Sequence, residues 1–79
     1  MNGIDTIKLR EIVKRGGGVI VSAKDVDIMT LRDLCRFAKA SGAHVVIRDA
    51  SKLGSIDCWE MARLCPGSVD FDFTSYSAD

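Results

Sequence analysis

The sequence has few of the residue types that usually build metal centres and disulfide frameworks. It contains one histidine, His44, and three cysteines, Cys35, Cys58 and Cys65, among 79 residues. An odd number of cysteines without a Cys-x-x-Cys pair does not fit a secreted disulfide scaffold, and these cysteines have no zinc spacing with His44. We therefore expect the cysteines to be small hydrophobic residues on helix faces, and we expect no metal site and no cofactor.

Long apolar runs and catalytic groupings are also missing. The longest apolar stretch is only a few residues, too short to span a bilayer, and charges interrupt the apolar residues of the N-terminal segment, unlike a signal peptide. No pair of carboxylates and no nucleophile with a nearby base stands out. We expect a cytoplasmic, monomeric protein with no catalytic residues, no enzymatic activity and no membrane partner.

Charge is balanced overall but not along the chain. Residues 1–56 hold ten basic and six acidic side chains, whereas residues 57–79 hold one basic and five acidic side chains. Nearly half of the residues, 47%, are apolar, which argues against disorder and for a single folded domain. The acidic C-terminal part argues against direct binding to nucleic acid, because phosphates repel carboxylates.

A helix-then-strand pattern recurs at intervals of about 25 residues. In each copy an amphipathic helical stretch is followed by glycine and a short apolar strand. The matching residues are Leu9, Ile12, Val13, Gly17 and 19–21; Leu34, Phe37, Ala38, Gly42 and 45–47; and Cys58, Met61, Ala62, Gly67, Val69, Phe71 and Phe73. We expect units at 1–23, 24–50 and 51–74 and a polar tail at 75–79.

The spacing of apolar residues predicts the elements of these units. It predicts a helix over 4–15, including Ile4, Ile7 and Ile12 on its apolar face, and a second helix from about Asp27–Thr30 to Gly42. Ser55 is the expected N-cap of the third helix. Strict alternation over 68–74 predicts a half-buried strand with Val69, Phe71 and Phe73 on its core face. The glycines at 16–18 follow a helix rather than a strand, which favours a helix end over a phosphate-binding loop.

Strands joined by single helices should lie parallel, and right-handed crossovers place those helices on one face of the sheet. We therefore predict an α/β fold with a three-stranded parallel sheet, helices on one face and a solenoid-like arrangement similar to leucine-rich repeats. One face of the sheet stays uncovered. The residues expected on it are Ile20, Ser22, His44, Val46, Arg48, Asp70 and Asp72.

The acidic side chains near the C-terminal end mark the candidate partner-binding surface. Asp70 and Asp72 lie on the expected edge strand, and Asp57 and Glu60 lie on the third helix. They form either an anionic platform for a basic protein, which could imitate nucleic-acid phosphates, or a charge that deters edge-to-edge pairing of strands. The expected binding residues are Asp70, Asp72, Asp57, Glu60, Arg48 and Val46.

The small size, the single α/β domain, the acidic residues of the third unit and the absence of catalytic motifs resemble phage-borne anti-CRISPR proteins, particularly inhibitors of type I Cascade complexes. The resemblance implies that the chain acts in a bacterial host cell. There it would bind a Cas subunit and block target DNA or recognition of the flanking PAM.

A second resemblance is local. The segment VVIRDASKLGSIDCWEMARL is similar to the strand, loop and helix of STAS domains, in which a serine near the helix start is phosphorylated. Ser51 or Ser55 matches that serine, which implies a phospho-regulated switch. An accessory α/β repeat module that completes a larger array is the other alternative.

Overall fold

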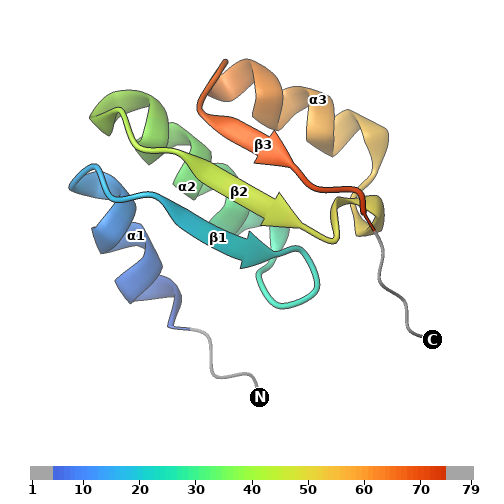
Figure 1. Ribbon diagram of the computed structural model, residues 1–79, viewed down its shortest axis with the longest axis horizontal. Helices are drawn as coiled ribbons and strands as arrows, with labels where there is room; N and C mark the ends of the chain where they lie inside the picture. The colour runs from blue at the N-terminus through green and yellow to red at the C-terminus, as the bar shows by residue number, and fades with distance from the viewer. Residues whose placement is uncertain (1–4, 75–79) are drawn as a thin grey trace.

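Three α-helices and three strands alternate along residues 5–74, the part of the chain that the computed structural model describes (Figure 1). The elements are α1 (Thr6–Lys14), β1 (Val19–Ser22), α2 (Ile28–Ser41), β2 (Val45–Arg48), the short 3-10 helix η1 (Ala50–Lys52), α3 (Ser55–Leu64) and β3 (Val69–Phe71). The predicted α/β class and the predicted order of elements are confirmed. The predicted helix start at Ile4 and the tail at 75–79 lie outside the described residues.

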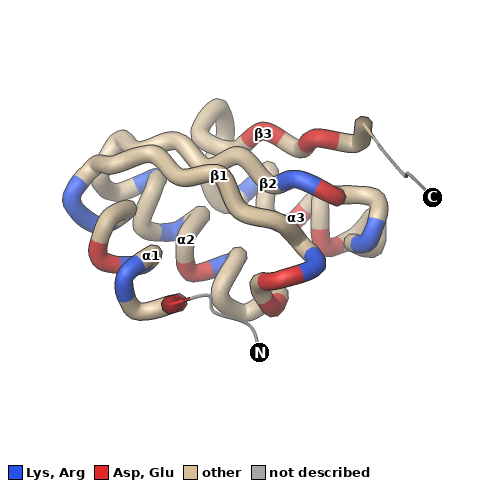
Figure 2. Tube along the Cα trace, turned by 60° about the horizontal axis from the view of Figure 1, so that its bottom comes forward, with Lys and Arg blue, Asp and Glu red and all other residues tan. Residues whose placement is uncertain are grey.

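The strands form one parallel sheet in the order β1-β2-β3, as predicted. Val19, Val45 and Val69 are aligned in register, and Ile20, Val46 and Asp70 form the next row. The helices all pack on one face, so the molecule has a helix layer and a sheet layer (Figures 1 and 2). Because side chains alternate across a strand, one row points into the core and the next points to the uncovered face.

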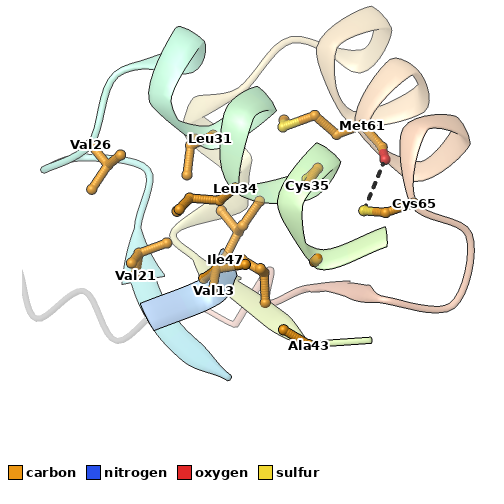
Figure 3. Close-up of a cluster of buried hydrophobic side chains, with 12 residues drawn as sticks. Val13, Val21, Val26, Leu31, Leu34, Cys35, Ala43, Ile47, Met61 and Cys65 are labelled. Carbon is orange, nitrogen blue, oxygen red and sulfur yellow. Dashed lines mark hydrogen bonds between the residues drawn. The ribbon is translucent and has the colours of Figure 1, made fainter. Parts of the chain in front are cut away.

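The buried core lies between the two layers, where apolar side chains of the strands meet the inner faces of the helices (Figure 3). Leu31, Leu34 and Cys35 of α2 lie completely buried above Val45 and Ile47 of β2. The remaining buried members are Val13, Val21, Val26, Ala38, Ala43, Met61 and Cys65. The middle helix and the middle strand therefore supply half of the buried core residues.

Residues with special backbone geometry end the helices. Gly16, just after α1, has φ +94°, and Gly42 caps α2 with φ +82°, a left-handed conformation that glycine adopts without steric cost. The prediction that the first glycines end a helix is confirmed. The predicted cap at Ser55 is wrong: Gly54 is the N-cap of α3, and no side chain caps that end.

Two predicted burial assignments are wrong on α1 and one is wrong on α3. Ile7 is 71% exposed and Ile12 is 38% exposed, although both follow the apolar spacing. The reason is that α1 is the end helix and has a neighbouring helix on one side only, so a narrower stripe is covered. Cys58 is half-buried, whereas Cys35 and Cys65 are fully buried as expected.

The third strand is shorter than the alternating pattern predicts. The carboxylate of Asp72 accepts hydrogen bonds from the backbone N–H of Thr74 at 2.9 Å and from its hydroxyl. This turn ends the extended chain, because an aspartate side chain can satisfy its own following backbone. Phe73 is consequently 59% exposed rather than in the core, although its ring lies 6.5 Å from that of Phe71.

A polar cluster fastens α1 to α2. Arg10 donates to the Thr30 hydroxyl at 3.2 Å and to the Asp33 carboxylate at 3.1 Å, and Thr30 in turn donates to Asp27 at 2.7 Å. Thr30 is only 3% exposed, so these bonds satisfy a hydroxyl that would otherwise be buried without a partner.

Within residues 5–74, no helix has the length and apolar character needed to cross a membrane.

Candidate functional site

The uncovered face of the sheet carries two apolar residues on β1 and β2, with charged residues beside them on β2 and β3. Ile20 of β1 is 70% exposed, and Val46, its partner in register on β2, is partly exposed. Ser22 and Arg48 form the next row, and Asp70 continues the Ile20–Val46 row onto β3. The residues that the sequence predicts for this face are therefore brought together on it.

The acidic residues of this face have histidine and arginine neighbours at the two ends of β2. The Nε2 atom of His44 lies 2.8 Å from Oδ2 of Asp70, and Nε of Arg48 lies 3.7 Å from Oδ2 of Asp72. Hydrogen bonds from Thr74 to the Asp72 carboxylate, first from the hydroxyl and then from the backbone, lower the pKa of Asp72. Asp72 is therefore ionised and hydrogen-bonded within the turn that it forms with Thr74. The side chain of Asp70 is 67% exposed, so a partner can reach it.

The structure does not bring Asp57 and Glu60 to this face. Both lie on α3 and pair with Arg32 of α2, where Nη2 of Arg32 lies 3.2 Å from Oδ1 of Asp57 and also contacts Oε1 of Glu60. The acidic residues in and directly after β3 belong to the sheet layer and those of α3 to the helix layer (Figure 2). The expected platform of four carboxylates is thus divided between the two layers.

A hydrogen bond between Ser22 and Asp49 borders the uncovered face where β1 and β2 end. The Ser22 hydroxyl donates to Oδ2 of Asp49 at 2.5 Å across 27 residues of chain. Asp49 has φ +58°, a left-handed conformation that aspartate tolerates better than most side chains. Sequence reasoning did not single out Asp49, and the only local signal is an aspartate directly after a strand.

The exposed apolar residues of the helix layer were also missed. Ile7, Met29 and Ile56 are 71%, 70% and 65% exposed, and each is the second residue of its helix. Trp59, one turn after Ile56, is 66% exposed. The sequence repeat does not identify this set, because Ile7 and Ile56 lie two residues before Leu9 and Cys58, whereas Arg32 occupies that position before Leu34.

The comparisons with known proteins come out empty. No protein-family model, curated protein or solved structure matches this chain.

The titratable groups of residues 5–74 form no group of three or more histidine, cysteine, aspartate or glutamate side chains that could hold a metal ion. Burial raises the pKa of Cys35 to about 12, and burial also raises the pKa of Cys65 and of Cys58. Thiols with raised pKa values are weak nucleophiles at neutral pH. At neutral pH these three thiols are therefore protonated.

Proposed function

We propose that this protein acts by binding another protein on the uncovered face of its sheet, without catalysing a reaction. The observation that supports this is the exposure of Ile20 on the edge strand β1 and of Val46 beside it on the central strand β2 of a parallel sheet. Parallel sheets usually have both faces covered, because their strands are apolar on both sides. A fully buried isoleucine side chain contributes roughly 1.5–3 kcal/mol relative to an exposed one, so a partner that covers Ile20 gains stability for the complex.

The charged side chains beside Ile20 and Val46 indicate which chemical groups a partner needs. Asp70 is the most exposed carboxylate of the face, and its row also holds Ile20 and Val46. A partner with an apolar contact for Ile20 and a lysine or arginine for Asp70 complements the face. Arg48 and Asp72, which lie 3.7 Å apart, frame this contact at the end of the strands.

The finer form of the proposal is inhibition of a bacterial nucleic-acid-targeting defence complex. Its basis is the resemblance to anti-CRISPR proteins together with Asp70 and Asp72 on the open face. The partner would be a Cas subunit of a type I complex, whose DNA-binding surface is basic because it holds phosphates. Carboxylates placed on that surface would exclude target DNA or prevent recognition of the PAM.

A phospho-regulated switch is the second candidate, and one observation favours it. Ser51 in η1 and Ser55 at the start of α3 are both exposed, so a kinase could reach either hydroxyl. A phosphate on Ser55 would lie at the N-terminus of α3, where negative charge is favourable. Incubation with a bacterial kinase fraction and labelled ATP, followed by mass spectrometry, tests this candidate; an unlabelled chain contradicts it. The accessory repeat module stays a third alternative, tested by recovery of a repeat-bearing partner.

Charge reversal tests the face and the partner separately. We expect Asp70→Lys combined with Asp72→Lys to abolish binding to a purified type I Cascade complex, and Ile20→Asp to do the same, while circular dichroism stays unchanged. Asp25→Lys, at an exposed loop position, is the control for a change of charge alone. Binding should weaken as salt rises, and the bound complex should lose its affinity for target DNA.

Two outcomes contradict different parts of the proposal. If Cascade does not bind the wild-type chain, the finer form is wrong, and a photo-crosslinking residue at position 20 then tests the face in a bacterial lysate. If Asp25→Lys weakens binding as much as the Asp70 and Asp72 changes, or if Ile20→Asp has no effect, the uncovered face is not the binding surface.

A further inference from the structure

A second surface lies in the helix layer, away from the uncovered face. Between α2 and α3 there is an open groove of about 420 Å³, lined by Arg32, Arg36, Glu60, Arg63 and Leu64. Three of these five side chains are arginines, and one is acidic. The lining side chains carry three positive charges and one negative charge, and Asp57 and Asp33 pair with two of the arginines from outside the groove.

The arginines of the groove differ in how far their donors are used. Nη2 of Arg32 contacts Asp57 and Glu60, whereas its buried Nε has no hydrogen-bond partner among residues 5–74. Arg36 donates from Nη1 to Oδ1 of Asp33 at 2.6 Å. Arg36 is nevertheless 57% exposed, and a guanidinium carries five N–H donors. Arg63 has no ion pair or hydrogen bond with any residue of the described range 5–74. Donors of two guanidinium groups are thus available in one groove.

We propose that this groove binds a phosphoryl group. Two guanidinium planes that face one groove can each make paired N–H···O bonds to a phosphate, a geometry for which arginine is better suited than lysine. The volume lies within the range of roughly 300–1,000 Å³ that small-ligand sites occupy, so there is room for a phosphate and part of the molecule that carries it. Leu64 supplies an apolar wall for that part.

Glu60 regulates access to the site. Its carboxylate lines the groove and contacts Arg32, so it is the group that an incoming phosphate displaces or repels. Removing its charge should therefore strengthen binding, whereas removing an arginine should weaken it. A merely structural role for these residues does not produce opposite effects of the two changes.

The site is independent of the proposed function. Its residues lie on α2 and α3, and none of them belongs to a strand. The two surfaces can therefore be tested separately.

Titration with inorganic phosphate tests the proposal, and the fluorescence of Trp59 reports on it. Trp59 is the single tryptophan of the chain, is 66% exposed and precedes Arg63 by about one turn of α3. We expect saturable binding at constant ionic strength. Arg63→Gln and Arg36→Gln should each weaken it about tenfold, as for the loss of a charge-assisted hydrogen bond. Glu60→Gln should tighten it severalfold.

Arg15→Gln is the matched control, because Arg15 follows α1 and its side chain is 71% exposed outside the groove. Its dissociation constant should equal that of the wild type. A parallel titration with AMP distinguishes the sources of the phosphoryl group. Equal affinity for both ligands supports recognition of phosphate alone, and tighter, arginine-dependent binding of AMP supports an organic phosphate.

The proposal is overturned if neither ligand binds at millimolar concentration. It is equally overturned if Arg36→Gln and Arg63→Gln bind as well as the wild type, or if Arg15→Gln loses as much affinity as they do. Circular dichroism establishes that each variant is folded. These side chains lie on the surface, so their replacement leaves the core intact.

Discussion

Replacing Leu34 by alanine is the sharpest test of how this fold is held together. Leu34 is completely buried on the inner face of α2, where the helix layer meets the sheet (Figure 3). Each buried methylene contributes about 0.8 kcal/mol, so shortening leucine to alanine costs about 2.4 kcal/mol before any cavity is counted. A cavity that does not collapse increases the expected loss to roughly 2–5 kcal/mol.

The size of the protein makes that loss severe. At roughly 0.05–0.15 kcal/mol per residue, a chain of 79 residues has a free energy of unfolding of about 4–12 kcal/mol. Leu34→Ala therefore removes a large part of it. Urea denaturation followed by circular dichroism measures the change as a lower midpoint at an unchanged slope.

Ile7→Ala is the matched control, because Ile7 is 71% exposed on α1 and loses little burial. Its free energy of unfolding should stay within about 0.5 kcal/mol of the wild type. A loss below about 0.5 kcal/mol for Leu34→Ala itself would show that α2 does not form the central contact between the layers.

Two further predictions concern titratable groups. A thiol reagent in native buffer should modify half-buried Cys58 first and leave buried Cys35 and Cys65 unmodified until denaturant is added; equal rates, counted by mass spectrometry, would contradict the core assignment. The hydrogen bond from Thr30 lowers the pKa of Asp27, so the contribution of Asp27 to stability is present above its unfolded pKa and is lost as pH falls through its folded pKa. Thr30→Val should raise the pKa of Asp27 measured by NMR and make acid unfolding less steep, and an unchanged pKa would refute this explanation.

The order of elements and the identity of the uncovered face could be predicted from the sequence. A short apolar run after a glycine indicates where each strand begins. The alternation of side chains along a strand indicates which of them share a face. Ile20, Val46 and Asp70 were placed together on that basis, and their register is as expected. These inferences depend only on local periodicity and on the handedness of crossovers.

Contacts between distant residues could not be predicted in the same way. Arg32 precedes Asp57 by 25 residues, and their side chains meet only because α2 packs on α3. The contacts with Arg32 place Asp57 and Glu60 in the helix layer and not on the sheet face. The arginine groove depends on the same packing. Phe73 was misplaced because the turn made by Asp72 overrides an alternation that otherwise continues to the end of the strand.

The order β1-β2-β3 has a consequence for cooperativity. β1 and β3 each pair with β2 and not with each other, and α2 lies between α1 and α3 in the same way. A destabilising change in α2 or β2, the middle pair, weakens the contacts with two neighbouring elements of the same layer. A change in α1 or β3 weakens the contacts with one. Local opening should therefore begin at either end and reach α2 and β2 last, which makes the middle pair the unit whose rupture coincides with global unfolding.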